Sequence, residues 1–366
     1  MASDPSAVPA LQDWTDDELM RRLARNSPDV WDPMLEETGT INSLNLRCKS
    51  PSSAGDLDRL SNETIVLALQ HLDLQSLCRF MATSFRAMEI AESLPLYRHL
   101  LRHASPALIV LGKTNLASYH TVSDLYAAIS SEECASCHRF GAFLFLPTCE
   151  RACLNCLHRN MRFWVLPAKE AQQTYGIPQK EMHQLPTMMS IQVRKQRGRR
   201  KKFVSVKLAR ELGLKIHGSP QEMTAWVLQS GKLGNNLNQY SCWAEAGETL
   251  LEWNNDDGRM PPPRSTCWGS ASVRFPHLRR DQRVDPGYWC EGCRFRRQQI
   301  SEVSNYSHGM DYIGKSPEEE KELERRHRDE LRDWSRPLLK EHVLCCLGAQ
   351  ELSCHLAAAQ DRPIAE

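Results

Sequence analysis

The sequence Cys134-Ala-Ser-Cys137 is followed, after fifteen intervening residues, by Cys153-Leu-Asn-Cys156. Each of these two Cys-x2-Cys pairs can occupy a tight turn, so that both of its thiolates point at one ion. The spacing is typical of a structural zinc site, and zinc is the cofactor that we expect. Four thiolates complete a tetrahedral shell and leave no open position, which indicates a structural and not a catalytic metal.

The residues between the two pairs fit a small hairpin folded over the metal, because they are apolar and largely aromatic. They include Phe140, Phe143, Leu144, Phe145 and Leu146. Cys149, His138 and His158 are spare donors, any one of which could replace a thiolate. The alternative to a metal site is a set of buried free thiols, since unpaired cysteine is among the most buried residue types.

The composition argues against several classes of protein. The chain has 366 residues, enough for two or three domains, and a formal net charge of +1, so no global field favours nucleic acid or an anionic membrane. No apolar run approaches the length of a membrane span, and the first residues lack the pattern of a secretory signal. We therefore expect an intracellular protein, cytoplasmic or nuclear, whose fourteen cysteines hold metal more readily than disulfides.

Residues 57–101 carry the periodicity of short amphipathic helices. Ser61 is a good N-cap for the first helix, and Asp73 for the second. Apolar residues recur on one face of each helix: Ile65, Leu69 and Leu72 in the first; Leu74, Leu77, Met81 and Phe85 in the second; Leu94, Leu96, Tyr97, Leu100 and Leu101 in the third. Such a three-helix bundle has little core of its own, so we expect it to bind a partner.

These helical residues resemble the F-box family. The resemblance rests on Leu60-Ser-Asn-Glu63, Ile65, Leu69, Leu72, Leu77, Arg79, Phe85, Arg86 and Leu96-Tyr97. Ser61 stands where the family usually has proline, and Phe85 where tryptophan is common; Ser61 keeps the helix start by capping it. The order of an F-box followed by a four-cysteine zinc site resembles that of fungal F-box proteins.

The resemblance implies a substrate-recruiting adaptor of a Skp–cullin–F-box type ubiquitin ligase. The helical module would bind a Skp-family adaptor, and through it a cullin scaffold, while the zinc-stabilised C-terminal region would bind a target protein. The implied docking residues are Leu60, Glu63, Ile65, Leu69, Leu72 and Leu77. The alternative is a zinc-stabilised nucleic-acid- or protein-binding module unconnected with ubiquitin.

Three further helices are expected beyond the first two cysteine pairs. Residues 163–165 are interpreted as a strand, after which Pro167 opens a short helix that ends at Gly176 in a left-handed C-cap. A similar unit begins at Val204 and reads as a helix followed by Gly213. The third helix covers residues 220–229, and its inward residues are Met223, Trp226 and Val227.

A run of seven basic residues in nine lies between the first two of these helices. It is a candidate phosphate-binding or nuclear-import patch. A solvated loop is the favoured interpretation, because the flanks lack the interleaved aromatic residues of single-strand binders. We therefore expect no nucleic-acid partner. The basic residues are Arg194, Lys195, Arg197, Arg199, Arg200, Lys201 and Lys202.

A third pair, Cys290-Glu-Gly-Cys293, needs two more ligands to hold a second zinc ion. The candidate ligands are Cys242 and Cys267, with His277 and His308 behind them. The remaining cysteines near the C-terminus show no metal spacing and are interpreted as buried thiols. They are Cys345, Cys346 and Cys354.

The expected fold class is mainly α with small β elements: a three-helix F-box-like bundle followed by a zinc-ribbon-like, irregular α+β C-terminal region. No Ser/His/Asp arrangement, P-loop, Gly-x-Gly-x-x-Gly or His-Glu-x-x-His pattern is present, so we expect no enzyme. The expected segments are 1–55, mostly disordered with a transient helix between Trp14 and Leu23; 56–102, the F-box-like module; 103–133, a helical connector; 134–165, the zinc-binding module; 166–310, an irregular α+β region with the candidate second zinc site; and 311–366, a charged helix and tail.

Overall fold

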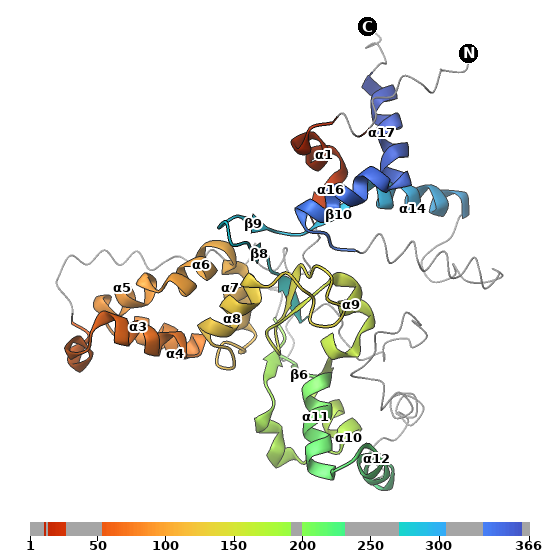
Figure 1. Cartoon of the computed structure of the whole chain (residues 1–366). Coiled ribbons are helices and arrows are strands. Elements are labelled where there is room, and N and C mark those ends of the chain that lie inside the picture. The colour runs from red at the N-terminus through yellow and green to blue at the C-terminus, as the bar shows by residue number, and fades with distance from the viewer. Residues whose placement is uncertain are drawn as a thin grey trace, which may run out of the picture. The chain divides into compact units, whose positions relative to one another are not determined.

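The computed structural model describes residues 11, 14–26, 53–191, 200–230, 271–304 and 332–360. The described chain is mainly helical with small antiparallel sheets, as the sequence predicts (Figure 1). It divides into a central unit, Asp29–Val284, and a terminal unit, which joins Met1–Pro28 to Asp285–Glu366. None of the described helices combines the length and the hydropathy that crossing a bilayer requires.

Six helices open the described part of the central unit. Ser61 and Asp73 cap the first two as predicted: the Ser61 side chain accepts from the Thr64 amide, and that of Asp73 from the Ser76 amide. Thr121 and Asp124 form a capping box that starts the last. The helices are α3 (Asn62–Gln70), α4 (Leu74–Met81), α5 (Phe85–Ser93), α6 (Pro95–His103), α7 (Ser105–Lys113) and α8 (Val122–Ser130), and a 3-10 turn, η3 (Gly55–Arg59), precedes them.

The prediction of three helices over residues 57–101 is wrong, because the described chain has four there, α3 to α6. The expected second helix does not continue to Phe85. It ends at Met81, and the Ser84 side chain then accepts from the Ala87 amide and caps a new helix that begins at Phe85. A local cap therefore divides the apolar stripe that the sequence presents as continuous.

The predicted docking residues fall into two groups. Ile65, Leu69 and Leu77 are buried in the helical core, so their side chains form no surface in this structure. Leu60 and Glu63 are exposed, and Leu72 is half-buried. The exposed apolar surface of this segment is instead made by Leu57, Leu60 and Leu67.

Two three-stranded antiparallel sheets follow in the central unit. The first has the order β3-β2-β7, with Phe143 opposite both Ala152 and Arg274. The second has the order β4-β6-β5, with Val204 opposite both Leu166 and Thr187. The strands are β2 (Phe143–Phe145), β3 (Glu150–Ala152), β4 (Val165–Pro167), β5 (Thr187–Met189), β6 (Lys202–Ser205) and β7 (Ser272–Arg274). The strand expected at 163–165 begins only at Val165, after a 3-10 turn.

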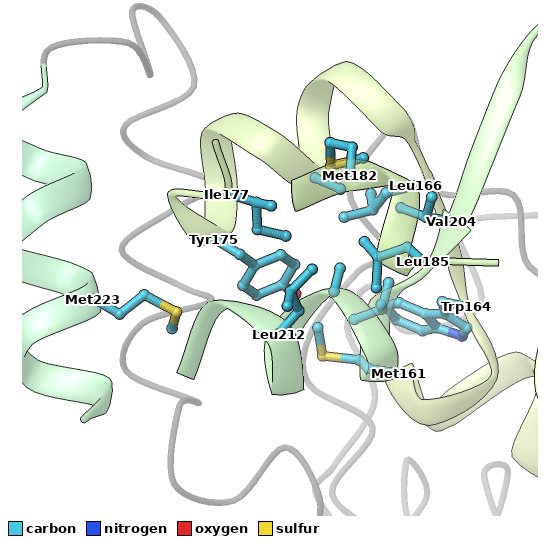
Figure 2. Close-up of a cluster of buried hydrophobic side chains, with 13 residues drawn as sticks. Met161, Trp164, Leu166, Tyr175, Ile177, Met182, Leu185, Val204, Leu212 and Met223 are labelled. Atoms are coloured by element: carbon cyan, nitrogen blue, oxygen red, sulfur yellow. The ribbon is translucent and has the colours of Figure 1, made fainter. Parts of the chain in front are cut away.

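Three helices pack around the second sheet and form an apolar core: α10 (Ala168–Tyr175), α11 (Val206–His217) and α12 (Pro220–Gln229). Figure 2 shows Tyr175, Ile177 and Leu212 directed toward one another, with Met223 reaching the cluster from α12. Gly176 ends α10 with φ of 62°, which confirms the left-handed cap. Trp226 does not point inward as predicted, since 39% of it is exposed.

The terminal unit brings the two ends of the chain together. Helix α1 (Asp16–Leu23) begins at the N-cap Thr15, and strand β1 (Ala24–Asn26) follows it directly. Strand β1 pairs antiparallel with β10 (Tyr288–Cys290). The unit is completed by α14 (Glu291–Ser304), α16 (Arg336–Cys345) and α17 (Leu347–Gln360). The charged helix expected within 311–366 lies outside the described residues up to position 331. The helix near Trp14 is thus a packed element in which Leu19 and Leu23 are buried.

Gly213 occupies a position in α11 where a side chain does not fit, although the sequence reads as a helix that ends there. A Cβ atom would lie 2.7 Å from the Tyr175 carbonyl oxygen and 2.9 Å from the Met223 sulfur. We predict that Gly213→Ala lowers the free energy of unfolding by about 1–3 kcal/mol through overpacking. The matched control is Gly112→Ala in α7, where no atom lies within 4 Å of the added Cβ. The higher helix propensity of alanine should there raise the free energy of unfolding by up to about 1 kcal/mol. Urea unfolding measures both, and equal stabilisation by the two changes would contradict the packing argument.

Candidate metal centres

Four cysteines gather at one point in the central unit, and they are the four that the sequence predicts. Cys134 and Cys137 lie in the turn between α8 and β2, and the Cys134 amide donates to the Arg139 carbonyl at 2.7 Å. Cys153 is the N-cap of α9 (Leu154–Arg159), and its sulfur accepts from the Cys156 amide at 3.4 Å. All four sulfur atoms lie within 4.8 Å of one another. We refer to this group as the first centre.

The spacing of the sulfur atoms in the first centre suits a tetrahedral metal. The Cys137 and Cys153 sulfurs are 3.6 Å apart. Two thiolates on one zinc ion would lie about 3.8 Å apart, given a Zn–S bond of about 2.3 Å. Cys134, Cys153 and Cys156 are buried and Cys137 is half-buried, so the centre is closed to solvent on most sides.

The four thiols of the first centre perturb one another's ionisation. Hydrogen bonds with Cys134, Cys153 and Cys156 lower the pKa of the Cys137 thiol. Contacts with Cys134, Cys137 and Cys156 raise the pKa of the Cys153 thiol well above its usual range. The contacts within the group thus favour the thiolate form of Cys134 and Cys137, whose pKa values are lowered, over that of Cys153, whose pKa is raised. Only a cation can stabilise all four as thiolates at this spacing.

The two cysteine-bearing turns of the first centre are tied to their surroundings by side chains outside the ligand set. Asn160, just after α9, donates from its amide to the Ser136 hydroxyl at 2.7 Å. The Ala135 amide donates to the Arg151 carbonyl at 2.8 Å. The buried Arg151 guanidinium donates to the backbone carbonyls of Ala128, Gly141, Phe275 and Pro276. The surrounding fold therefore fixes both turns through contacts that need no ion.

Two of the three spare donors suggested by the sequence, Cys149 and His138, do not join the first centre. Cys149 is outside the group of four, and burial raises the pKa of its thiol. His138 is exposed and lies 3.3 Å from Glu133. The side chain of His158 lies outside what the structure describes.

A second group of four ligands lies in the terminal unit: Cys290, Cys293, His342 and Cys346. Cys290 ends β10, Cys293 lies in the first turn of α14, and His342 and Cys346 lie on and just after α16. The Cys346 sulfur lies 3.8 Å from that of Cys290 and 3.7 Å from that of Cys293, and the Cys293 sulfur is 3.2 Å from His342 Nε2. These sulfur separations match the value of about 3.8 Å for one tetrahedral zinc ion. We call this group the second centre.

The second centre shows the same mutual perturbation. Contacts with Cys290 and Cys346 raise the pKa of the Cys293 thiol, while hydrogen bonds with Cys290 and Cys293 lower the pKa of the Cys346 thiol. The His342 ring stacks on Trp334, with ring centroids 4.3 Å apart. This contact holds the imidazole with Nε2 toward the sulfur atoms.

The sequence identified half of the second centre. Cys242, Cys267 and His308 lie outside the described residues, and His277 lies 3.7 Å from Glu132 in the central unit. The sequence predicts Cys346 to be a buried thiol that is not spaced for metal binding. Cys346 is buried, but the prediction about its spacing is wrong, because it joins the group of four. Cys345 and Cys354 are exposed and not buried. The missed signal is the His342-x3-Cys346 spacing, which puts two ligands one helical turn apart.

The basic run is described only in part, because Arg194, Lys195, Arg197 and Arg199 lie outside the described residues. The Arg200 guanidinium donates to the carbonyl oxygens of Ser190 and Lys113. Lys201 and Lys202 are exposed, and Lys202 begins β6. The described end of the run thus pairs with backbone and continues into a strand.

Comparison with known proteins finds no matching family model, no similar curated protein and no similar solved structure.

We predict that Cys137→Ser lowers the metal content of the purified protein by one ion per chain, because three sulfur ligands remain where the closed site needs four. The matched control is Cys149→Ser, which lies four residues from Cys153 and outside the ligand set. Elemental analysis by mass spectrometry measures the content. A full complement in Cys137→Ser, or a loss in Cys149→Ser, would contradict the ligand assignment.

Proposed function

We propose that this chain is a non-catalytic adaptor of a Skp–cullin–F-box type ubiquitin ligase, in which zinc at the first centre stabilises a target-binding region. The helical segment from α3 to α6 would bind a Skp-family protein, and through it a cullin scaffold. The zinc-held part of the chain would present a surface to the protein that is to be modified. No residue of the chain performs chemistry in this scheme.

The proposal of zinc rests on the donor set of the first centre. Four sulfur donors at tetrahedral spacing suit a borderline-soft ion, whereas magnesium and calcium take oxygen ligands. A complete set of protein ligands leaves no position for water or substrate, which is the arrangement of a structural ion. The ion would supply folding energy to the turn between α8 and β2, which carries Cys134 and Cys137, and to α9, which is capped by Cys153 and contains Cys156.

The observation that carries the adaptor proposal is an exposed apolar surface on the segment that resembles an F-box. Leu60 is 48% exposed just before the N-cap of α3, and Leu67 is 61% exposed two turns further on. Ile65 and Leu69 lie on the opposite, buried side of the same helix. A short helix with apolar residues on both sides is stable when a partner covers the outer side.

The burial of Leu69 determines which variants can test the docking. Substitution of a buried residue would unfold the helices and remove any contact indirectly. Leu60→Asp and Leu67→Asp change exposed residues, so they spare the fold and introduce a charge into the docking surface. Leu228→Asp in α12 is the matched control, because Leu228 is also exposed, at 49%, outside the F-box-like segment.

We predict that the full chain binds a Skp-family protein, and that Leu60→Asp and Leu67→Asp each raise the dissociation constant by at least about tenfold. Leu228→Asp should bind as the unchanged chain does. Isothermal titration with purified proteins measures the constants, and circular dichroism checks the helical content. The proposal fails if the folded chain binds no Skp-family protein tested at micromolar concentration, or if Leu67→Asp binds with unchanged affinity.

A further inference from the structure

The N-terminal segment 14–26 meets the second centre at one of its ligands. Strand β1 pairs with β10 so that Ala24 lies opposite Cys290 and Arg25 opposite Trp289. The Arg25 guanidinium also covers the Trp289 ring at 5.0 Å and lies 3.4 Å from the Glu291 carboxylate. The residue that begins the ligand set is therefore a member of the strand pair that holds the N-terminal segment.

Helix α1 packs on α16, which carries His342 and is followed directly by Cys346. Its buried side chains Leu19 and Leu23 share one core with Leu339 and Val343 of α16. Two ion pairs flank this core: Asp17 contacts Arg336 at 2.8 Å, and Asp16 contacts Lys340. Because Val343 is adjacent to His342, a shift of α16 at this candidate ligand would alter the surface on which α1 lies.

Trp334 connects the two halves of the second centre. Its backbone amide and carbonyl exchange hydrogen bonds of 2.9 Å with Tyr288, two residues before Cys290. Its ring stacks on His342. The neighbouring Asp333 accepts a hydrogen bond of 2.8 Å from the indole of Trp289. Strand β10, which pairs with β1, and helix α16, on which α1 packs, are thus joined beside the candidate metal ligands.

The core that holds the N-terminal segment is small. Within the described residues it has nine buried members, two of which are candidate metal-ligating cysteines. A small domain with such a core depends on a metal, a disulfide or a partner for stability. The members are Leu11, Leu19, Leu23, Cys290, Trp334, Leu339, Val343, Cys346 and Ala349.

We propose that Cys290, Cys293, His342 and Cys346 bind one zinc ion, and that this ion fixes the N-terminal segment 14–26 to the C-terminal part of the chain. The three thiols release their protons to solvent when the ion binds, and His342 binds as the neutral imidazole. Three sulfurs and one imidazole nitrogen form a closed set for structural zinc. The inference is independent of the adaptor function.

The proposal is tested on the full chain by hydrogen exchange of the backbone amides, with the zinc content measured on the same samples. The unchanged protein should carry two zinc ions per chain. The variants His342→Ala and Cys346→Ser should each carry one. In both variants the amides of residues 16–26 should exchange at least about tenfold faster, because the segment is no longer held. The amides of residues 143–152 near the first centre should be unaffected.

Three variants serve as matched controls. Cys345→Ser changes an exposed cysteine next to Cys346 that is outside the ligand set, so zinc content and exchange should stay unchanged. His342→Cys restores a four-ligand set and should recover both the second zinc ion and the protection of residues 16–26. Cys153→Ser removes the first ion and should leave that protection intact. Unaltered exchange of residues 16–26 in zinc-depleted Cys346→Ser would overturn the proposal.

A reciprocal measurement covers the case in which the ligand variants lose their structure entirely. Leu23→Asp displaces α1 and changes no ligand. Since two linked events strengthen each other equally, it should speed the release of the second zinc ion to EDTA by at least about tenfold. The release of the first ion should be unchanged. Equal release rates of the second ion from Leu23→Asp and from the unchanged chain would overturn the coupling.

Discussion

Mutual repulsion between crowded sulfur ligands is the constraint on which both parts of this chain depend. In each centre the four ligand atoms lie within 4.8 Å of one another, a separation at which several thiolates cannot coexist without a cation. A divalent ion bound at either centre would convert this repulsion into attraction and so stabilise the segments that carry the ligands. The hairpin of β2 and β3 and the strand pair of β1 and β10 are both built directly on such segments.

The sequence predicts features that short stretches of chain determine. Ser61, Asp73 and Gly176 act as expected, because a cap involves a few neighbouring residues. The first centre belongs to the same class, since its two pairs lie on local turns within one short segment. In the second centre the Cys-x2-Cys half is local and was predicted. His342 and Cys346 lie about fifty residues further on, and their spacing is shared by many helices that bind no metal.

Features decided by packing were harder to predict. The periodicity of α3 identifies apolar residues, yet it does not tell that Leu69 is buried while Leu67 is exposed. Glycine illustrates the same difficulty: Gly176 ends its helix through a positive φ, whereas Gly213 lies within a helix, at a point where Tyr175 and Met223 leave no room for a side chain. Both positions read as glycine after an amphipathic run. Whether such a glycine ends a helix or lies within it depends on neighbours that are distant in sequence.

The arrangement of the terminal unit makes the central unit an insertion between two parts of one smaller fold. The pairing of Ala24 with Cys290 closes a loop of roughly 260 residues, but closure entropy rises only as the logarithm of loop length, by about 0.6 kcal/mol per doubling. Loop length is therefore a minor term. The stability of the contact between the N-terminal segment and the C-terminal part of the chain therefore depends on β10 and α16. There the small core and the second group of candidate metal ligands share residues.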